Sequence, residues 1–356
     1  MKRMKRIVFI ALAAVLALSV GLIGCGEPVV PPEDWDSEIA LTMHCTISDR
    51  ASIVEEIFVP WLEDVHALVG DDGGTFNITV TYGEAPFSAA TSLNGISTGA
   101  TDIGQLSPET FNLGGAGYLP WKFDSIESVA YVAYHLWTES DGVWDANGEL
   151  DLVKILITAP LWGSQLWSTT ESGNMTVVGD WAGIKVRTDA QVVESDSISA
   201  MGAIPVYLGV ADLPGSLDSG VVNACFFTYS GIGFFAGLGG STEHTTELNM
   251  IYRPYSLAMN LDSYNALPDD AQTALDSVCG AAKSVELATA HLAAQAEDRA
   301  ETDADRTIYV PSGPEMADYA TAVANVDDFW AGNMTILGFD GTGMMARIDA
   351  LIAAGP

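Results

Sequence analysis

The sequence predicts a two-lobed α/β fold. A length of 356 residues favours two domains over one. From Ile39 onward, strand-like runs alternate with runs of helical spacing, which is typical of parallel sheets joined by crossover helices. A helical run from Asp269 to about Arg306 would extend about 50 Å, enough to lie across two domains. With 48% hydrophobic and 17% charged residues, the chain can bury a large core.

Residues 1–24 have the pattern of a lipoprotein signal peptide. Four basic residues within the first six are followed by an apolar run that ends at Ile23. The segment LIGC, which ends at Cys25, is similar to the bacterial lipobox, in which the cysteine carries the lipid. We therefore expect Cys25 to be lipidated and residues 25–37 to form a flexible, lipid-anchored tether. An uncleaved membrane anchor is the alternative. Both place the folded part outside the cytoplasm, anchored to the membrane in the periplasm or at the cell surface.

The chain is strongly acidic, with a formal net charge of −33. Without residues 1–24 and their four cations, 47 acidic residues face 10 basic ones, which gives −37. This balance argues against nucleic acid, whose phosphates require Lys and Arg, and against docking on anionic lipids. It favours a solvated, self-repelling surface. No Asp-x-Asp-x-Asp-Gly calcium loop is present, and we expect neither a metal ion nor a cofactor.

Three cysteines remain beyond Cys25, and none of them belongs to a Cys-x-x-Cys pair: Cys45, Cys225 and Cys279. An odd number without that spacing argues against a disulfide framework and a zinc site. Their default role is apolar packing, although one pair could bridge in an oxidising compartment.

The first part of the chain has the pattern of three strands separated by two helices. The strands are expected at 39–43, 76–82 and 101–106, and the helices at 53–68 and 88–97. In parallel sheets, ligands bind beyond the carboxyl ends of the strands. His44, Glu84 and the segment Gln105-Leu106-Ser107 fall at those ends, and we take His44, Gln105 and Ser107 as candidate ligand-binding residues.

A crossing into the second lobe follows a helix at 125–137 and a strand at 152–157. The crossing covers residues 159–168 and contains Trp162 and Trp167. A tryptophan here can belong to the core or line a cleft, and Trp167 is kept as a candidate ligand contact.

The stretch from Asp180 to Tyr229 organises the rest of the chain. It has the pattern strand, helix, strand, helix, strand, with helices at 191–201 and from Asp212 to Gly220. Its first strand carries a lone arginine, Arg187, at its end. Since so acidic a chain has few cations, an arginine within an apolar strand suggests an anion receptor.

The last part is expected to return to the first lobe and then to become helical. We expect strands at 248–252, 256–260 and 308–310, a helix from 269 to about 306 interrupted only by Gly280, and helices at 316–334 and 344–353. The apolar stripe of the long helix is too narrow for a coiled coil. The predicted units are lobe 1 at 38–160 with a return segment at about 253–290, lobe 2 at 161–252 with about 291–335, and a C-terminal helix at 336–356.

Four segments in this order resemble one family, the extracytoplasmic solute-binding proteins of TRAP transporters, the tripartite ATP-independent carriers. The segments are ISTGATDIG at 96–104, DWAGIKVR at 180–187, MGAIPV at 201–206 followed by LDSGVVNA at 217–224, and YNALPDDAQ at 264–272. The resemblance covers roughly residues 39–335. It implies a periplasmic-binding-protein-like fold with a ligand cleft between the lobes and a long helix that spans both.

The resemblance also gives Arg187 a role. Arg187 stands where the family's arginine forms a salt bridge with the ligand carboxylate. A guanidinium offers a planar two-donor fork to a carboxylate, and a closed cleft lowers the effective dielectric around the pair. The alternative is an internal ion pair with one of the many acidic residues.

Two departures from the family pattern indicate the ligand. Phe227 stands where many members have Asn, and Trp167 stands where many sugar-acid binders have a second arginine. We therefore expect a ligand with one carboxylate and an apolar or aromatic body, or a 2-oxo acid, rather than a polyhydroxy acid. Val210 and Tyr229 complete the expected apolar lining.

The expected function is an extracytoplasmic receptor that delivers this carboxylate to small and large TRAP membrane subunits for ion-coupled uptake. Catalytic motifs such as Gly-x-Ser-x-Gly or His-Glu-x-x-His are absent from the sequence, so we do not expect an enzyme. We expect a monomer. The alternatives are a solute-binding lipoprotein of an ATP-driven importer and a ligand sensor for a receptor kinase.

Overall fold

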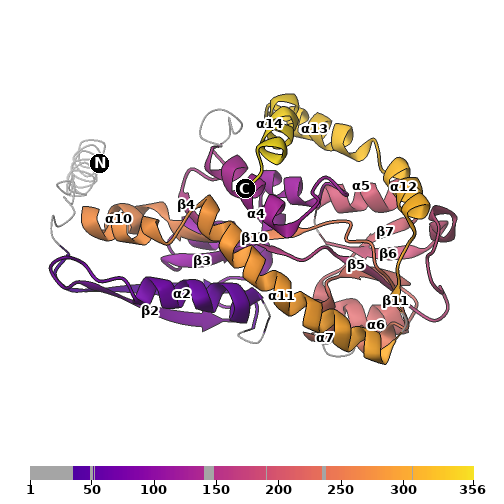
Figure 1. Cartoon of the computed structure of the whole chain (residues 1–356), viewed down its shortest axis with the longest axis horizontal. Helices are drawn as coiled ribbons and strands as arrows, with labels where there is room; N and C mark the ends of the chain where they lie inside the picture. The colour runs from indigo at the N-terminus through magenta and orange to yellow at the C-terminus, as the bar shows by residue number, and fades with distance from the viewer. Residues whose placement is uncertain are drawn as a thin grey trace, which may run out of the picture.

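In the computed structural model of the chain, two β-sheets lie next to each other and are covered by helices (Figure 1). Residues 1–34, which include the expected signal peptide, Cys25 and most of the expected tether, lie outside the described residues. The structure describes residues 35–48, 51, 53–139, 148–189, 191–234, 238–306 and 308–356. Trp35, within the range assigned to the tether, is buried against Phe76, with ring centroids 4.6 Å apart.

The first sheet has five strands in the order β2-β1-β3-β10-β4. They are β1 (Glu38–Cys45), β2 (Thr75–Tyr82), β3 (Ile103–Leu106), β4 (Val153–Leu161) and β10 (Arg253–Asn260). β1 pairs in parallel with β2 and β3, as the sequence predicts, whereas β10 is antiparallel to β3 and β4. The carboxyl ends of β1 and β3 therefore share one edge of the sheet.

The helices of the first lobe pack their regularly spaced apolar side chains against this sheet. They are η1 (Val54–Phe58), α2 (Val59–His66), η2 (Ala89–Thr91), α3 (Ser92–Ser97), η3 (Pro108–Thr110), η4 (Asn112–Tyr118) and α4 (Ile126–Thr138). The helix expected at 53–68 consists of a π-helical turn followed by an α-helix. Ile57, Trp61 and Val65 are fully buried, which matches the expected spacing of four residues.

The second sheet has six strands in the order β11-β9-β5-β8-β6-β7. They are β5 (Gln165–Ser168), β6 (Lys185–Thr188), β7 (Ile204–Tyr207), β8 (Ala224–Phe227), β9 (His244–Thr246) and β11 (Ile308–Tyr309). β6 lies between β7 and β8 and is parallel to both. The helices of this lobe are η5 (Val178–Trp181), α5 (Val192–Ala200), η6 (Val210–Asp212), α6 (Leu213–Asp218), α7 (Tyr229–Phe234) and α8 (Leu238–Ser241).

The strand expected at 248–252 is wrong. Its first two residues bond to a side chain instead of a strand, because Gln165 Oε1 accepts hydrogen bonds from the amides of Leu248 at 2.8 Å and Asn249 at 3.1 Å. Asn249 also has a positive φ of 47°, which a strand does not permit. Strand β9 lies just before this segment, where the sequence predicted none.

The single long helix expected from 269 to 306 is two helices, α10 (Asp269–Ser277) and α11 (Ala281–Asp305), after the short α9 (Leu261–Asn265). Gly280 separates them with a φ of 101°, and its amide donates to the Leu156 carbonyl at 2.9 Å. Although shorter than predicted, α11 contacts η1 and α4 of the first lobe and α7 of the second. It runs diagonally along both lobes (Figure 1).

The C-terminal segment forms three helices instead of the two predicted. They are α12 (Gly313–Ala322), α13 (Val326–Ile336) and α14 (Gly341–Ala354). α13 packs against α5 of the second lobe and α14 against α4 of the first. This segment therefore returns across both lobes on the side opposite α11 in the view of Figure 1.

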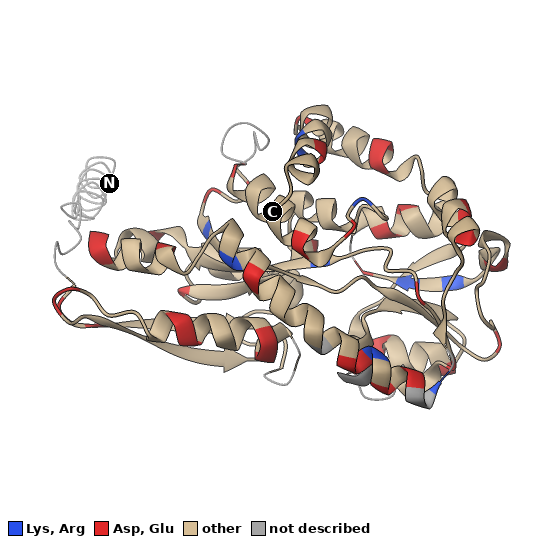
Figure 2. Cartoon of the chain, viewed as in Figure 1, with Lys and Arg blue, Asp and Glu red and all other residues tan. Residues whose placement is uncertain are grey.

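Cys45, Cys225 and Cys279 are unpaired. Burial raises the pKa of each thiol to about 12, so the thiols stay protonated near neutral pH and act as packing groups. Within the described part of the chain, no helix is long and apolar enough to cross a membrane. The same residues contain no cluster of three or more His, Cys, Asp or Glu that could hold a metal ion. Acidic residues are spread over both lobes, whereas Lys and Arg are few (Figure 2).

Candidate ligand-binding site

Arg187 lies near the carboxyl end of β6, the strand next to the edge strand β7 of the second sheet. Before the strand, Asp180 accepts hydrogen bonds from the amides of Thr176 and Val177, and Gly183 turns the chain with a φ of 78°. Parallel neighbours on both sides then fix the register of Arg187, opposite Val206 on β7 and Cys225 on β8. The backbone of Arg187 is thus held on both sides by neighbouring strands, which fixes the position from which its side chain extends.

Arg187 is 8% exposed as a whole residue, yet its guanidinium has no carboxylate within 4.0 Å among the described residues. Its Nε donates to the Leu208 carbonyl at 3.0 Å, which orients the group. The ring of Phe227 lies 5.7 Å from its Cζ, within the range of a cation–π contact. A buried guanidinium with a single backbone acceptor is costly unless an anion completes it.

Arg253, by contrast, is neutralised inside the protein. Its Nε pairs with Asp189 Oδ2 at 3.1 Å, and its Nη2 pairs with Glu194 Oε1 at 2.6 Å. The Tyr118 hydroxyl donates to Asp189 Oδ2 at 3.1 Å, and the Thr188 hydroxyl donates to Glu194 Oε2 at 3.1 Å. The internal ion pair that the sequence left open for Arg187 is therefore made by a different arginine.

The two carboxyls that bind Arg253 differ in acidity. Burial and the neighbouring Asp189 charge raise the pKa of Glu194 to about 7. Burial would raise the pKa of Asp189 as well, but the guanidiniums of Arg253 and Arg187 hold it below its usual range. One buried guanidinium thus forms ion pairs with two carboxyls, and Asp189, with the lower pKa, is the one that stays ionised to lower pH.

This network joins the two lobes. Arg253 begins β10 of the first sheet, whereas Asp189 and Glu194 follow β6 of the second. A further link runs from Gln191 Nε2 to the Pro108 carbonyl at 2.7 Å. Arg187 therefore lies beside the contact between the lobes.

The first lobe contributes a polar edge to this contact. Side-chain atoms of four residues are buried there without a hydrogen-bond partner among the described residues: Thr46 Oγ1, Gln105 Nε2, Ser107 Oγ and Glu109 Oε2. Thr46 follows β1, and the other three end or follow β3. The amide of Thr46 donates to Gln105 Oε1 at 3.1 Å, which fixes the orientation of the Gln105 amide group. Gln105 and Ser107 were predicted from the sequence as ligand-binding residues.

Glu109 connects this edge electrostatically to Arg187. Burial, followed by the Asp189 charge, raises the pKa of Glu109 to about 7, and the positive charges of Arg253 and Arg187 oppose the shift. Sequence reasoning missed Glu109 and the Arg253 network. The signal available for Glu109 was its place two residues after Ser107, in the same segment beyond β3.

Trp167 and Tyr229 lie on the same side of the second sheet as Phe227, within the apolar cluster under α6 and α7. Trp167 is fully buried, and its indole nitrogen donates to the Phe227 carbonyl at 2.9 Å. The Tyr229 hydroxyl donates to Glu247 at 2.6 Å, and its ring meets Trp167 edge-on at 5.8 Å. Trp167 and Tyr229 therefore belong to the same apolar cluster as Phe227. Val210 is half-buried at the start of η6.

His44 is fully buried at the end of β1 and has partners on both ring nitrogens. Nδ1 lies 2.9 Å from the Thr81 hydroxyl, and Nε2 lies 3.0 Å from the Phe87 carbonyl, to which it donates. The Phe87 ring packs edge-on against the imidazole. The structure thus places His44 in the first sheet with its hydrogen-bonding capacity already used.

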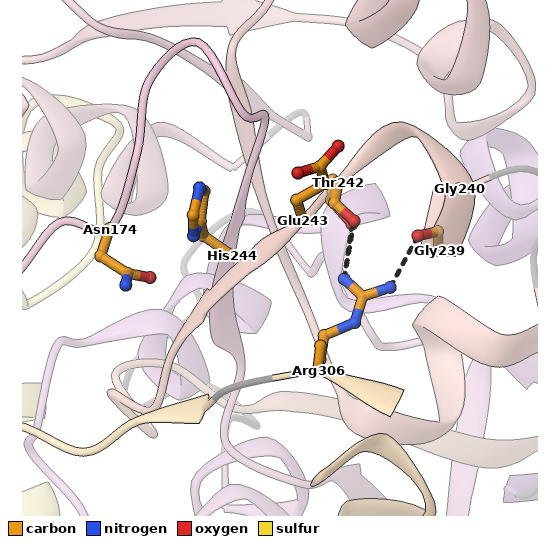
Figure 3. A pocket seen from close by; sticks show the side chains of 7 residues that line it. All are labelled: Asn174, Gly239, Gly240, Thr242, Glu243, His244 and Arg306. Atoms are coloured by element: carbon orange, nitrogen blue, oxygen red, sulfur yellow. Dashed lines mark hydrogen bonds between the residues drawn. The ribbon is translucent and has the colours of Figure 1, made fainter. Parts of the chain in front are cut away.

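A separate surface pocket of about 500 Å³ lies in the second lobe (Figure 3). Its lining residues are Asn174, Gly239, Gly240, Thr242, Glu243, His244 and Arg306. The guanidinium of Arg306 points to the backbone carbonyls of Gly239, at 2.6 Å, and Thr242, at 2.8 Å. None of the residues predicted from the sequence lines this pocket.

A two-lobed α/β molecule with an unpaired arginine beside the contact of its lobes has the architecture of a solute-binding protein. The chain belongs to the family described as bacterial extracellular solute-binding protein, family 7, or DctP, whose model matches residues 153–333. This family comprises TRAP solute-binding receptors and is not a class of enzymes.

One curated relative is the C4-dicarboxylate-binding periplasmic protein DctP of Rhodobacter capsulatus. It is 26% identical over 102 residues, which are 29% of this chain and 30% of that protein. The match thus spans less than a third of the relative's length.

Solved structures match over much more of the chain. A TRAP solute-binding protein of Rhodoferax ferrireducens, in complex with copurified benzoate, has a TM-score of 0.78 and 20% identity over 89% of this chain and 98% of its own. A marine metagenome TRAP solute-binding protein specific for aromatic acid ligands, in complex with 3-hydroxybenzoate, has a TM-score of 0.79 and 20% identity, over 90% and 99%. The predicted two-lobed fold is thereby confirmed.

Proposed function

We propose that this chain is the extracytoplasmic receptor of a TRAP transporter and that it captures a small organic carboxylate between its lobes. The ligand has one carboxylate and an apolar or aromatic body, or is a 2-oxo acid. The receptor delivers it to the small and large membrane subunits for ion-coupled uptake. Cys25 carries the lipid that keeps the receptor at the membrane.

The observation that carries this proposal is that the guanidinium of Arg187 has no carboxylate partner among the described residues. Within the same residues, Arg253 has two carboxylates as partners, whereas Arg187 donates to one backbone carbonyl. A ligand carboxylate would supply the missing charge and accept two hydrogen bonds from the planar fork. A pair closed off between the lobes is stronger than one in water, because the effective dielectric is lower there.

The neighbourhood of Arg187 supports an apolar ligand body. The Phe227 ring lies beside the guanidinium, and Trp167 with Tyr229 packs behind it. The second cation that would favour a dicarboxylate or a sugar acid is absent from position 167, where the structure has a fully buried tryptophan. The aromatic acids named for the similar solved proteins fit this environment, whereas the dicarboxylate named for the Rhodobacter relative needs a second positive group.

The receptor is tested by a thermal-shift screen over benzoate, phenylacetate, branched 2-oxo acids, succinate and gluconate. A ligand present at 100 times its Kd stabilises a protein by about 2.7 kcal/mol, which gives a rise of a few degrees in Tm. We expect such a rise with an apolar monocarboxylate, and its loss in Arg187→Gln. Arg347→Gln is the matched control, because Arg347 pairs with Glu139 on the surface.

Two results would contradict the proposal. One is an Arg187→Gln variant that binds the ligand as tightly as the parent, which would show that Arg187 does not anchor the carboxylate. The other is tight binding of gluconate or succinate without any apolar monocarboxylate. The coupling is tested separately in vesicles that contain the membrane subunits: uptake driven by an ion gradient supports the TRAP role, whereas uptake that requires ATP supports the importer alternative.

A further inference from the structure

Among the described residues, four buried polar side-chain atoms without a hydrogen-bond partner belong to segments at one edge of the first sheet, whereas two such atoms, Asn174 Oδ1 and Thr245 Oγ1, lie in the second lobe. Gln105 and Ser107 are fully buried and Thr46 is 5% exposed, yet each carries a buried side-chain atom that has no hydrogen-bond partner in the described part of the chain. Glu109 adds a carboxyl oxygen in the same condition. Buried groups of this kind cost free energy unless a partner satisfies them.

The chemistry of these atoms is mixed and specific. The orientation of Gln105 is fixed by the Thr46 amide on Oε1, so its free Nε2 is a donor. The free Oε2 of Glu109 is an acceptor when the carboxyl is ionised. Thr46 and Ser107 each offer a hydroxyl, which both donates and accepts. A hydroxyl group on a ligand matches such a set, because it also donates and accepts.

The charges at this edge exclude a second carboxylate. Among the described residues, the charges of Asp189, Arg253 and Arg187 affect the pKa of Glu109. Glu109 in turn raises the pKa of Tyr118 and Tyr255, which lie close to it. Arg253 is already paired with two carboxyls. A second ligand carboxylate would therefore meet an acidic side chain without a free cation beside it.

Resting on the proposed function, we propose that Glu109 and Gln105 form a specificity subsite for a hydroxyl group at the end of the ligand remote from its carboxylate. The ligand class is then a hydroxylated aromatic or apolar monocarboxylate. Arg187 holds the carboxylate from the second lobe, and the hydroxyl reaches the polar edge of the first lobe. One molecule thus bonds to both lobes, which favours their closure around it.

The test compares benzoate, 3-hydroxybenzoate, 4-hydroxybenzoate and isophthalate by calorimetric titration of the purified chain. We expect at least one hydroxybenzoate to bind ten times more tightly than benzoate, and isophthalate to bind more weakly than benzoate. In Glu109→Gln, the advantage of the hydroxyl should fall to threefold or less while benzoate binding is retained. Glu63→Gln, on the exposed face of α2, is the control that leaves both affinities unchanged.

A pH series separates direct contact from a structural effect. Since the pKa of Glu109 is raised to about 7, the advantage of the hydroxybenzoate should grow as the pH rises through 7 and the carboxylate becomes a stronger acceptor. The Gln variant should lose this dependence. Equal affinity for benzoate and both hydroxybenzoates in the parent chain would overturn the subsite and leave the receptor function intact. Failure of all four acids to bind would overturn both.

Discussion

Arg253 and Asp189 form an ion pair, 3.1 Å from Nε to Oδ2, that joins β10 of the first sheet to the strand end that carries Arg187. Asp189 follows Arg187 by two residues, so one short segment positions the proposed ligand anchor and links the lobes. Tyr118 of the first lobe donates to the same carboxylate at 3.1 Å. Any movement of the lobes that changes this pair also moves the guanidinium expected to hold the ligand.

Replacing Arg253 by Met should strongly destabilise the fold. The variant leaves Asp189 and Glu194 buried without their cation, and breaking a buried pair in this way costs about 3–5 kcal/mol. Urea unfolding followed by tryptophan fluorescence measures the loss. Arg347→Met is the control, because the side chains of Arg347 and Glu139 are each about one-third exposed, and removing such a partly solvated pair should cost less than removing the buried one. Equal losses in the two variants would contradict the assignment of Arg253 as a buried structural cation.

Stability should depend on pH through Glu109. Burial and the Asp189 charge raise the pKa of Glu109 to about 7 in the folded chain, from 4.5 when unfolded. Between these values the folded state binds more protons than the unfolded state, so the free energy of unfolding falls as the pH rises from about 4.5 to about 7. Glu194 acts in the same direction, whereas the lowered pKa of Asp189 acts only at lower pH.

The measurement is the free energy of unfolding in urea at pH 5, 6, 7 and 8 for the parent and for Glu109→Gln. We expect the variant to lose less stability than the parent between pH 5 and 7, and the two curves to run parallel above pH 8. Glu63→Gln should reproduce the parent curve. Identical slopes for parent and Glu109→Gln would show that Glu109 titrates normally.

The fold was largely predictable because its signals are local. Alternation predicted β2, an apolar strand-like run predicted β1, and the four-residue spacing of Ile57, Trp61 and Val65 predicted the buried face of the helix between them. The errors arise where contacts with residues distant in the sequence determine the local backbone structure. The chain turns at Gly280 because its amide reaches Leu156, and the segment at 248–252 leaves the sheet because Gln165 binds its backbone. Neither contact has a signature in the neighbouring sequence.

The site was predictable only in part for the same reason. Arg187 could be identified from its strand and from the family motif around it. Whether it or Arg253 would be paired depends on contacts between residues more than 50 positions apart in the sequence, such as Arg253 with Glu194. Glu109 is one of many acidic residues, and only burial beside two arginines distinguishes it.

Variants of Trp167 and Phe227 should affect different properties, the first mainly the stability of the fold and the second mainly ligand binding. Trp167→Phe removes the indole hydrogen bond to the Phe227 carbonyl and part of a fully buried side chain, which should cost about 1–3 kcal/mol of stability. Phe227→Leu alters a half-buried ring beside Arg187 and should weaken binding of an aromatic acid about tenfold. Unfolding in urea and calorimetric titration are measured on both variants. Weaker binding in Trp167→Phe than in Phe227→Leu would show that Trp167 contacts the ligand directly.

Helix α11 should link the lobes through two adjacent turns. His291 Nδ1 bonds to Glu56 of η1 in the first lobe, and Gln295 Nε2 donates to the Ser230 hydroxyl of α7 in the second at 3.0 Å. His291 is fully buried and the Glu56 side chain is 27% exposed, so their contact is partly shielded from water. A double-mutant cycle of Glu56→Gln and His291→Leu should therefore give a coupling energy of about 1–3 kcal/mol in urea unfolding.

The matched cycle uses Lys283 and Glu286, an ion pair on the same helix whose glutamate is well exposed. Its coupling should be about 0.5 kcal/mol or less, since solvent screens such a pair and side-chain entropy opposes it. A Glu56–His291 coupling as small as this would show that the pair adds no more to the stability of the fold than an exposed ion pair does. The attachment of α11 to the first lobe would then rest on its other contacts, such as the ion pair of Lys283 with Asp64 at 2.6 Å and the hydrogen bond from the Thr158 amide to the Ser284 hydroxyl at 2.9 Å.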